Sequence, residues 1–341
     1  MLKTKYRVGW DIGGAHLKAA LLDEYGVALQ VHQLACPLWR GLHELERAIT
    51  EMCKLLQMPE ALSLVTMTGE LVDLFPNRQT GVCEIAKVVN KLLGQHVMFY
   101  GGAAGWINFN NVASQTHAIA SMNWHASAQY VAHSIDKGLF VDIGSTTTDM
   151  IPVEKIPSAS IGQTDAQRMA NQALIYTGIV RTPLMALGQT INFKAKSYYL
   201  AAEYFATTAD VYRMLQLLPI DVDLADTADG KGKTLPETAR RLARMVGHDA
   251  EDCAMSDWVD LAETFKQLQK NTLMQAIQAH MDNQRMPIIS AGVGAFLAKE
   301  IADELGLPSV NVAEYVQAKD SQTLEQAVNC FPAYAVARLA I

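Results

Sequence analysis

Residues 8–23, VGWDIGGAHLKAALLD, decide how the chain begins to fold, because an acid and two glycines directly follow an apolar strand. Residues 138–153, GLFVDIGSTTTDMIPV, repeat this arrangement much later in the chain. Each stretch predicts two strands joined by a short turn, since apolar runs bounded by glycine are typical of hairpins. The repeat predicts an α/β protein of two modules, each of which opens with an Asp-Ile-Gly hairpin.

Helices and further strands are expected after each hairpin. The first module predicts a three-stranded meander over 6–35, helices at 41–57 and 80–94, strands at 62–69 and 96–102, and one or two helices within 111–134. The second predicts strands at 138–144, 146–153 and 154–159, a helix at 256–283, a strand at 286–292, a helix at 294–305, a strand at 309–312 and a closing helix at 321–338. We therefore expect domains at 1–137 and 138–341, the second with an excursion at 195–255.

Composition narrows the class of protein. The 341 residues are 50% hydrophobic and 18% charged, enough for two domains with full cores. A net charge of −7 argues against a nucleic-acid-binding surface. Five separated cysteines without a C-x-x-C motif indicate reduced thiols and no metal or disulfide framework. With no signal peptide and no apolar run of membrane-span length, we expect a cytoplasmic protein that binds no membrane.

The first hairpin has the residues of a phosphate site. Gly13 and Gly14 lack side chains, so their backbone N–H groups can approach a phosphate closely. Asp11 beside them would repel phosphate unless a cation lay between, which indicates Mg²⁺ held by Asp11. Lys18 returns toward the turn along the second strand and can supply a positive charge. The alternative is a plain hairpin with a surface lysine.

The second hairpin is richer in polar groups. Gly144 is followed by the hydroxyls of Ser145, Thr146 and Thr147, which can donate hydrogen bonds to phosphate oxygens. Asp142 and Asp149 can both face a metal ion or a bound water across the hairpin. The alternative is a threonine-rich strand pair with solvated ends, because threonine suits strands.

A third glycine turn lies at Gly292 and Gly294, in PIISAGVGAFLAKEIADEL. Such a strand–turn–helix unit exposes N–H groups at a helix N-terminus, which can seat an anion or a nucleoside. Many turns between a strand and a helix have this form, so the turn alone is not specific.

Taken in order along the chain, the two hairpins, the Thr68-Gly69 turn, the Ala-Gly-x-Gly turn and a closing helix resemble the superfamily of actin, heat-shock chaperone ATPases and sugar kinases (ASKHA). The resemblance implies two ribonuclease-H-like domains with a central cleft, and phosphates and Mg²⁺ between the two hairpins. The run DIGSTTTD resembles the hydantoinase A/oxoprolinase branch of that superfamily.

Longer stretches carry a narrower resemblance. Residues 67–75, 162–187, 202–215 and 225–234 are similar to proteins linked to tetrahydromethanopterin-dependent one-carbon transfer. These are related to an enzyme of methanofuran synthesis that joins an aminomethylfuran-methyl diphosphate to the phenol of a tyramine conjugate. The resemblance implies a transferase that acts on small molecules and releases diphosphate from a furfuryl carbon. A phenol, with a pKa near roughly 10, also needs a base or a late proton transfer.

Each candidate residue has an expected role. We expect catalytic roles for Lys18, Asp149 and Arg181; phosphate binding by Gly13, Gly14, Lys18, Gly144, Ser145, Thr146, Thr147, Gly292 and Gly294; Mg²⁺ binding by Asp11 and Asp142; and substrate binding by Asp165, Arg168, Tyr176, Thr177, Asp226 and Asp229. Arg181 can instead tie a loop, and Asp226 and Asp229 can be turn formers. Glu70 and Asp73 either reach the cleft or begin a solvated helix. Among the histidines only His16 is placed near the cleft, and a plain hairpin residue is the favoured interpretation of it.

Two other functions use the same residues. An ATP-dependent kinase or a hydantoinase/oxoprolinase-type hydrolase would hold phosphates in the hairpins and the adenosine of ATP or ADP at Gly292–Gly294. A non-catalytic nucleotide-binding protein is a third interpretation, but scaffolding does not require the acids and hydroxyls clustered at 142–149. The sequence leaves open the exact acceptor, the base and whether the chain forms a homo-oligomer.

Overall fold

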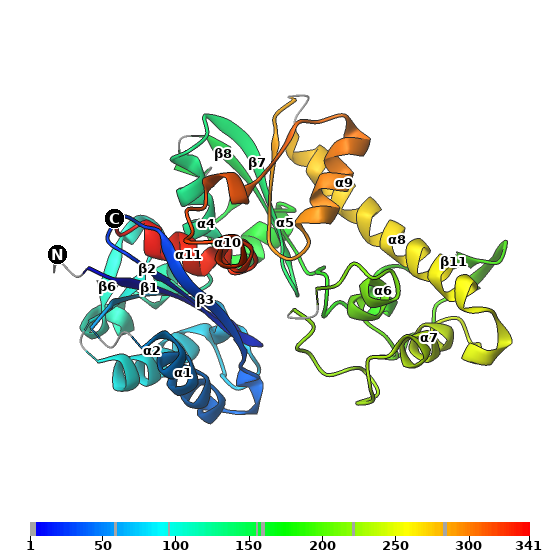
Figure 1. The fold of residues 1–341 in the computed structure, drawn as a ribbon, viewed down its shortest axis with the longest axis horizontal. Helices are drawn as coiled ribbons and strands as arrows, with labels where there is room; N and C mark the ends of the chain where they lie inside the picture. Colours follow the sequence, from blue (N-terminus) through cyan, green and yellow to red (C-terminus); the bar gives the residue numbers. More distant parts are fainter. Residues whose placement is uncertain are drawn as a thin grey trace. The chain divides into compact units, whose positions relative to one another are not determined.

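The computed structural model describes residues 5–57, 60–94, 96–154, 156–157, 161–219, 222–281 and 285–341 (Figure 1). The chain divides into two compact units. Unit 1 contains residues 1–138, 152–165 and 311–341, and unit 2 contains residues 139–151 and 166–310. Both units are built on a mixed sheet with helices, so the α/β class predicted from the sequence is confirmed.

Unit 1 is built on a six-stranded sheet in the order β3-β2-β1-β4-β5-β6. Its strands are β1 (Arg7–Ile12), β2 (His16–Leu22), β3 (Ala28–Ala35), β4 (Leu62–Met67), β5 (Val97–Tyr100) and β6 (Trp106–Asn108). The first three form the predicted antiparallel meander, whereas β1, β4 and β5 run parallel. The carboxyl ends of these parallel strands therefore share one edge of the sheet, where ligands of open α/β sheets usually bind.

Helices cover unit 1 with apolar faces. They are α1 (Leu42–Leu56), α2 (Arg78–Leu93), α3 (Thr116–Ile119), α4 (Asn123–Ala132), α10 (Ser321–Asn329) and α11 (Phe331–Arg338). Leu45, Ile49 and Met52 of α1 recur at helical spacing and are fully buried in a core shared with β1 and α2. The helices predicted at 41–57 and 80–94 are thereby confirmed.

The last thirty residues pack on unit 1, which differs from the expected division at residue 137. Helix α11 packs against β1, β2 and α4 (Figure 1). The backbone N–H of Ala28 donates to the carbonyl of Gln317 at 2.8 Å, and Lys319 N–H donates to Ala28 O at 3.0 Å. These bonds cover the outer edge of β3, which would otherwise present unpaired backbone groups to solvent.

The closing helix predicted over 321–338 is two helices, because the chain breaks at Cys330 between α10 and α11. Pro332 lies in the first turn of α11. A proline in the interior of one continuous helix would lack an N–H donor and clash with the preceding turn, whereas the first turn tolerates it.

Unit 2 repeats the centre of this sheet. Its strands lie in the order β10-β8-β7-β13-β14, namely β10 (Leu174–Ile175), β8 (Thr148–Glu154), β7 (Lys137–Ile143), β13 (Ile288–Ala291) and β14 (Ser309–Asn311). Strand β13 runs parallel to β7, as β4 runs parallel to β1. Helices α5 (Asp165–Ala170), α8 (Met255–Met281) and α9 (Ala295–Leu305) follow in the sequence.

The third strand predicted at 154–159 is only the two-residue β9 (Ile156–Pro157), which pairs with β8. Residues 155 and 158–160 lie outside the described part of the chain, as do residues 282–283 of the predicted long helix. The strand that extends the sheet beyond β8 is β10, which lies after α5.

The excursion from unit 2 has a hydrophobic core of its own. It contains the hairpin β11 (Thr190–Phe193) and β12 (Lys196–Tyr199), and helices α6 (Thr208–Met214) and α7 (Leu235–Arg244). Phe193, Leu242 and Trp258 are buried together, and the rings of Phe193 and Trp258 stack with centroids 5.3 Å apart. The excursion thus extends to the first half of α8.

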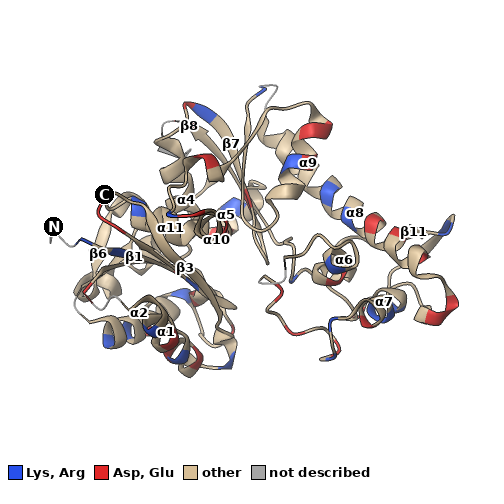
Figure 2. Ribbon diagram, viewed as in Figure 1, with Lys and Arg blue, Asp and Glu red and all other residues tan. Residues whose placement is uncertain are grey.

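Charges of both signs are spread along helices such as α1 and α8 (Figure 2). No helix within the described ranges is long and apolar enough to pass through a membrane.

Candidate functional site

The first hairpin is closed by a single backbone hydrogen bond, from Gly13 N–H to His16 O at 2.9 Å. The carbonyl of Ile12 accepts a second bond, from Thr68 N–H at 2.9 Å. The Thr-Gly turn after β4 is therefore fastened directly to the Asp-Ile-Gly turn after β1. His16 is buried and contributes its carbonyl, which is the hairpin role expected for it.

Asp11 is the centre of a polar row across three strands. It pairs in register with Lys18 of β2 and Thr66 of β4, so the three side chains share one face of the sheet. Lys18 Nζ lies 3.8 Å from Asp11 Oδ2. Burial raises the pKa of Asp11, an effect that the charge of Lys18 opposes.

Two atoms of this row lack a hydrogen bond. Asp11 is 4% exposed and Thr66 is fully buried, yet neither Asp11 Oδ1 nor Thr66 Oγ1 has a partner among the described residues. Buried polar atoms normally have a partner, so the pair fits a position where a water or a hydrated cation supplies the missing bonds. Thr66 was not predicted as a site residue, because only the parallel register of β1 and β4 places it beside Asp11.

The second hairpin has the same backbone bonds. Gly144 N–H donates to Thr147 O at 2.9 Å, and the carbonyl of Ile143 accepts from Gly294 N–H at 2.8 Å. The Ala-Gly-x-Gly turn after β13 therefore fastens this hairpin as the Thr-Gly turn fastens the first. Asp142 and residues 144–147 are partly exposed at the carboxyl end of β7.

Gly292 is required at its position in the third turn. Its φ is +75°, a conformation that favours glycine, and a Cβ atom there would overlap Asp142 Oδ1. The turn thus lies against the Asp142 carboxylate, and Gly294 immediately precedes α9. The structure brings together the second and third glycine turns, which the sequence treated as separate elements.

Asp149 is paired with a buried arginine. Asp149 follows Thr147, which accepts the closing hydrogen bond of the second hairpin, by two residues, as Lys18 follows His16 in the first. Asp149 therefore has the position in the second hairpin that Lys18 has in the first. Arg168 of α5, which is 2% exposed, forms an ion pair and hydrogen bond with Asp149 Oδ1. A buried guanidinium that binds a carboxylate in this way holds α5 against β8. The substrate role predicted for Arg168 stays a prediction, as does the catalytic role of Asp149.

Residues 177–182 form the backing of the second hairpin. Ile179 N–H donates to Gly144 O at 3.0 Å, and Val180 and Arg181 N–H both donate to Ser145 O, at 3.0 and 2.9 Å. Thr177 is held by Gln269 of α8, whose Nε2 lies 2.9 Å from Thr177 Oγ1.

The backbone of Arg181 is therefore fixed beside the backbone of Ser145. Burial lowers the pKa of its guanidinium, and the half-buried Tyr204 lies close enough to oppose this shift. Tyr176, just before this segment, is 53% exposed.

The loop with the other two predicted substrate residues has a structural explanation. Asp229 Oδ1 lies 3.1 Å from Arg241 Nη1 and accepts a hydrogen bond from Lys231 N–H at 3.2 Å. Arg241 is fully buried and also binds Asp210 at 2.7 Å. Asp229 thus forms the turn that the alternative interpretation described, whereas Asp226 is exposed.

The remaining acids separate clearly. Glu70 is 1% exposed, whereas Asp73 is exposed on the surface. Asp165 is 4% exposed and accepts a hydrogen bond from Arg78 Nη2 at 2.9 Å. These buried carboxyl groups lie after β4 and at the start of α5, within unit 1.

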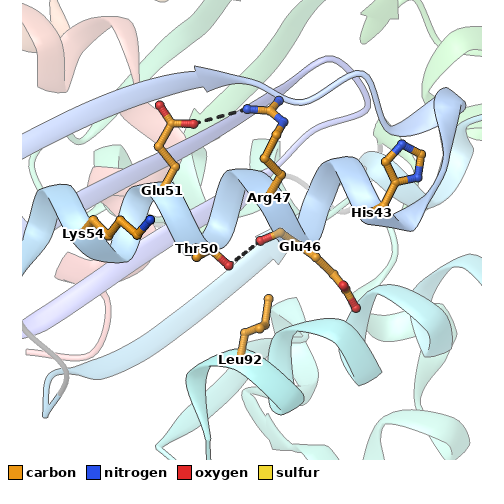
Figure 3. A pocket seen from close by; sticks show the side chains of 7 residues that line it. All are labelled: His43, Glu46, Arg47, Thr50, Glu51, Lys54 and Leu92. Atoms are coloured by element: carbon orange, nitrogen blue, oxygen red, sulfur yellow. Dashed lines mark hydrogen bonds and ion pairs between the residues drawn. The ribbon is translucent and has the colours of Figure 1, made fainter.

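A shallow surface groove on α1 is unrelated to these residues (Figure 3). His43, Arg47, Glu51 and Lys54 line it together with Leu92 of α2. Arg47 is bound to Glu51 at 3.2 Å and the Thr50 hydroxyl to the Glu46 carbonyl at 2.7 Å. The groove has none of the predicted site residues, and its Arg47 and Glu51 bind each other.

Two sheets that each present an Asp-Ile-Gly hairpin, fastened by a turn from the adjacent parallel strand, define the actin-like ATPase class of fold. The fold is similar to that of a nucleotide-free structure of acetone carboxylase, with a TM-score of 0.52 and 10% sequence identity. The comparison covers 88% of this chain and 67% of the acetone carboxylase chain. The model of the hydantoinase/oxoprolinase family matches residues 62–337. The chain belongs to that family.

Two curated relatives have one enzyme name, (4-{4-[2-(gamma-L-glutamylamino)ethyl]phenoxymethyl}furan-2-yl)methanamine synthase. The protein of Methanocaldococcus jannaschii is 29% identical over 309 residues, 89% of this chain and 90% of that protein. The protein of Methanococcus vannielii is 29% identical over 180 residues, 52% of this chain and 81% of that protein.

Proposed function

We propose that the protein is a transferase that joins an aminomethylfuran-methyl diphosphate to the phenol of a tyrosine- or tyramine-glutamate acceptor and releases diphosphate. The observation that carries the proposal is the similarity to the Methanocaldococcus jannaschii synthase over 89% of the chain. That enzyme's name describes an aryl ether between a phenol and a furan-bound CH₂ group. By forming such an ether, the protein would catalyse a step in the synthesis of methanofuran or methylofuran, which is used in tetrahydromethanopterin-linked one-carbon metabolism.

The reaction forms one C–O bond and breaks another. The phenol oxygen bonds to the furfuryl carbon while the bond between that carbon and the diphosphate oxygen breaks, and the electron pair leaves on diphosphate. A leaving group with this much negative charge needs compensation at the moment of bond cleavage. Lys18 and the backbone N–H groups of Gly14 and residues 145–147 are the groups that we assign to this task.

Asp11 and Asp142 are the proposed ligands of Mg²⁺, which would neutralise the charge that develops on the diphosphate. Within the described residues no three His, Cys, Asp or Glu side chains form a metal-binding group. That fits Mg²⁺, which is usually held by one or two carboxylates together with substrate phosphates and waters. The buried Asp11 Oδ1, which has no hydrogen-bond partner in the described part of the chain, supports the first of these ligands.

Arg181 and Tyr176 are proposed to bind the acceptor. Arg181 is fixed by its backbone beside Ser145, and a guanidinium can bind a carboxylate such as that of a glutamyl group through two hydrogen bonds. Tyr176 is exposed nearby in the sequence and offers an aromatic face.

The test combines the purified protein with the furan diphosphate, the phenolic acceptor and Mg²⁺ in the absence of ATP. We expect an ether whose mass equals the sum of the substrates less diphosphate. Lys18→Ala should slow ether formation by about 10²-fold, as expected for the loss of one transition-state donor. A lack of any ether, with normal folding of the protein, would contradict the proposal.

An ATP-dependent hydrolase or kinase is the second candidate, because the chain belongs to the hydantoinase/oxoprolinase family. Thermal unfolding with Mg²⁺ plus diphosphate, ADP or ATP separates the two. A ligand at about a hundred times its Kd stabilises the native state by about 2.7 kcal/mol. Stabilisation by diphosphate as large as that by ATP favours the transferase, whereas stabilisation by ATP and ADP alone favours the second candidate.

A further inference from the structure

A buried polar cluster lies beside the first hairpin and has no role in the proposed phosphate site. Glu70 follows β4, Ser121 precedes α4 and Asp165 is the first residue of α5. Ser121 Oγ lies 2.8 Å from Glu70 Oε1 and 3.1 Å from Asp165 Oδ2. The three residues are 1%, 3% and 4% exposed in that order, and all belong to unit 1.

The distances require one more proton than the ionised residues carry. The Ser121 hydroxyl has a single hydrogen, which it can donate to one of the two carboxyl groups. The second carboxyl oxygen also lies within hydrogen-bond distance of Ser121 Oγ. This contact is favourable only if that carboxyl group is protonated and donates a hydrogen bond to Oγ. The cluster therefore binds a proton between two carboxyl groups.

Glu70 is the group that holds this proton. Burial raises the pKa of Asp165 as well, but the charge of Arg78 and the hydrogen bond that it donates to Asp165 Oδ2 oppose this shift. Glu70 Oε2 is buried and has no hydrogen-bond partner among the described residues, so a charge there would be poorly solvated. Burial raises the pKa of Glu70 to about 7, and the charged groups around it are Asp165 and Arg78.

The backbone is shaped to hold this arrangement. A Cβ atom at Gly81 of α2 would lie 2.8 Å from the Cα and carbonyl oxygen of Glu70, so the glycine allows α2 to pack directly on it. Ser121 has a φ of +54°, which is unusual for a residue other than glycine. Strained residues of this kind are concentrated at functional sites.

The cluster adjoins the first hairpin through its own chain. Glu70 follows Thr68 and Gly69, and Thr68 N–H is bound to Ile12 O. At its outer end the Asp165 side chain, which is 6% exposed, is bound to Arg78, whose side chain is 41% exposed. A proton that reaches Asp165 from this end can move inward through Ser121 to Glu70.

We propose that Asp165, Ser121 and Glu70 form a proton relay that takes up the proton of the phenolic acceptor. The proposal rests on the proposed transferase function and deepens it by supplying the base. Asp165 is the group that meets the phenol. Ser121 and Glu70 act through Asp165 and are positioning residues.

The transfer balances without another reactant. The phenolic O–H bond breaks as the phenol oxygen bonds to the furfuryl carbon, and diphosphate leaves with the electron pair of its C–O bond. The phenolic proton goes to the Asp165 carboxylate, which passes a proton to Ser121 Oγ while the Ser121 hydroxyl donates its own to Glu70 Oε1. Glu70 ends neutral, and Asp165 returns to the ionised form that Arg78 stabilises.

The relay accepts a proton only when Glu70 is ionised, so kcat/KM for ether formation in the parent protein should rise as the pH passes through about 7. Glu70→Gln should lower kcat/KM by about 10²-fold or more and remove this rise. Ser121→Gly should do the same without lowering the melting temperature, because glycine adopts a φ of +54° without strain. Glu84→Gln, at a solvent-accessible glutamate of α2 bound to Lys87, is the matched control and should keep both rate and profile.

A second readout does not depend on activity. Carbon-13 NMR of the glutamate side chains should show one carboxyl that titrates near pH 7 in the parent and is missing from Glu70→Gln. Ether formation by Glu70→Gln and Ser121→Gly with the parent's rate and pH profile would overturn the relay and leave the transferase intact. Absence of ether from the parent itself, with that titration still observed, would overturn the transferase and, with it, the assignment of the relay to a phenol.

Discussion

The two Asp-Ile-Gly hairpins have the same backbone and different side chains. In each, the glycine N–H closes the turn at 2.9 Å and the preceding carbonyl accepts a bond from the next parallel strand's turn. In the first, Asp11 lies between Lys18 and Thr66; in the second, Asp142 lies beside Ala291 and the position of Lys18 is taken by Asp149. The scaffold is duplicated, whereas the charges on it are not.

This difference separates two tasks. The Lys18–Asp11–Thr66 row holds a carboxylate with an unfilled hydrogen-bonding position, which suits a bound cation and phosphate. In the second hairpin the only arginine described on Asp149 is buried and secures α5, so its phosphate-binding capacity lies in the exposed turn 144–147. We therefore expect replacement of Lys18, the partner of Asp11, to reduce activity, and replacement of Arg168, the partner of Asp149, to reduce stability.

The largest effect is expected from the two carboxylates. Asp11→Asn and Asp142→Asn should each slow Mg²⁺-dependent ether formation by about 10³-fold, because each removes a proposed ligand of the cation that stabilises the departing charge. Both variants should unfold at a denaturant concentration close to that of the parent. Single-turnover rates over a Mg²⁺ titration measure the effect, and rates within a few-fold of the parent in both would end the metal assignment.

The next effect tests the ion pairs of the two hairpins. Arg168→Met should lower the free energy of unfolding by about 3 kcal/mol, because it leaves the Asp149 carboxylate without its buried partner. Lys18→Met should lower it by less than about 1 kcal/mol, since Lys18 is partly exposed and 3.8 Å from Asp11. Urea denaturation of both variants gives the comparison; equal losses would contradict the division of tasks.

The pH dependence of stability tests the first unit alone. Burial raises the pKa of Glu70 in the folded state to about 7, from an ordinary value of 4.5, so its contribution to stability is complete below about 4.5 and is lost as the pH rises through 7. The loss should be roughly 3 kcal/mol, at about 1.4 kcal/mol per pKa unit. Glu70→Gln should remove this slope, and a parent protein whose unfolding free energy does not fall between these pH values would contradict it.

The smallest effect concerns Thr66. Thr66→Val keeps the shape of the side chain and removes the hydroxyl beside Asp11, so it should weaken Mg²⁺ binding about tenfold, as the loss of a group that orients a metal ligand commonly does. Thr66→Ser should retain the parent's affinity because it keeps the hydroxyl. Calorimetric titration of Mg²⁺ with diphosphate measures both variants; equal binding by Thr66→Val would show that the hydroxyl plays no part.

Much of the fold could be predicted from the sequence, because the spacing of apolar residues and the position of glycines at turns can be recognised within a few residues. Strands at 6–35 and helices such as 42–56 follow from residues a few positions apart. Two features did not follow, since they depend on distant contacts. Residues 317–319 bind the edge of β3, and Pro332 divides the closing helix only because both halves pack as separate segments.

The candidate site shows the same limit. Asp11, Asp142 and the glycines of the two hairpins stand out because the Asp-Ile-Gly motif occurs twice after an apolar run, and they lie at the carboxyl ends of β1 and β7 as predicted. Thr66 and Ser121 carry no local signal, since only the register of β4 and the fold of residues 119–123 bring them to carboxyl groups. For Asp229 the sequence offered both a substrate role and a turn; the ion pair with Arg241 is a distant contact that the sequence did not indicate, and the substrate role stays a prediction.

The way in which residues 311–341 return to unit 1 has a consequence for synthesis of the protein. The chain passes between its units four times, and α11 closes the face of the sheet that β1 and β2 begin. On the ribosome, that sheet face must wait for the final helix to emerge, although its strands are made first. Unit 2 can fold while β1 and β2 still lack α11. The sheet of unit 1, which is synthesised first, is therefore completed last, and its exposed apolar face needs protection from aggregation during translation.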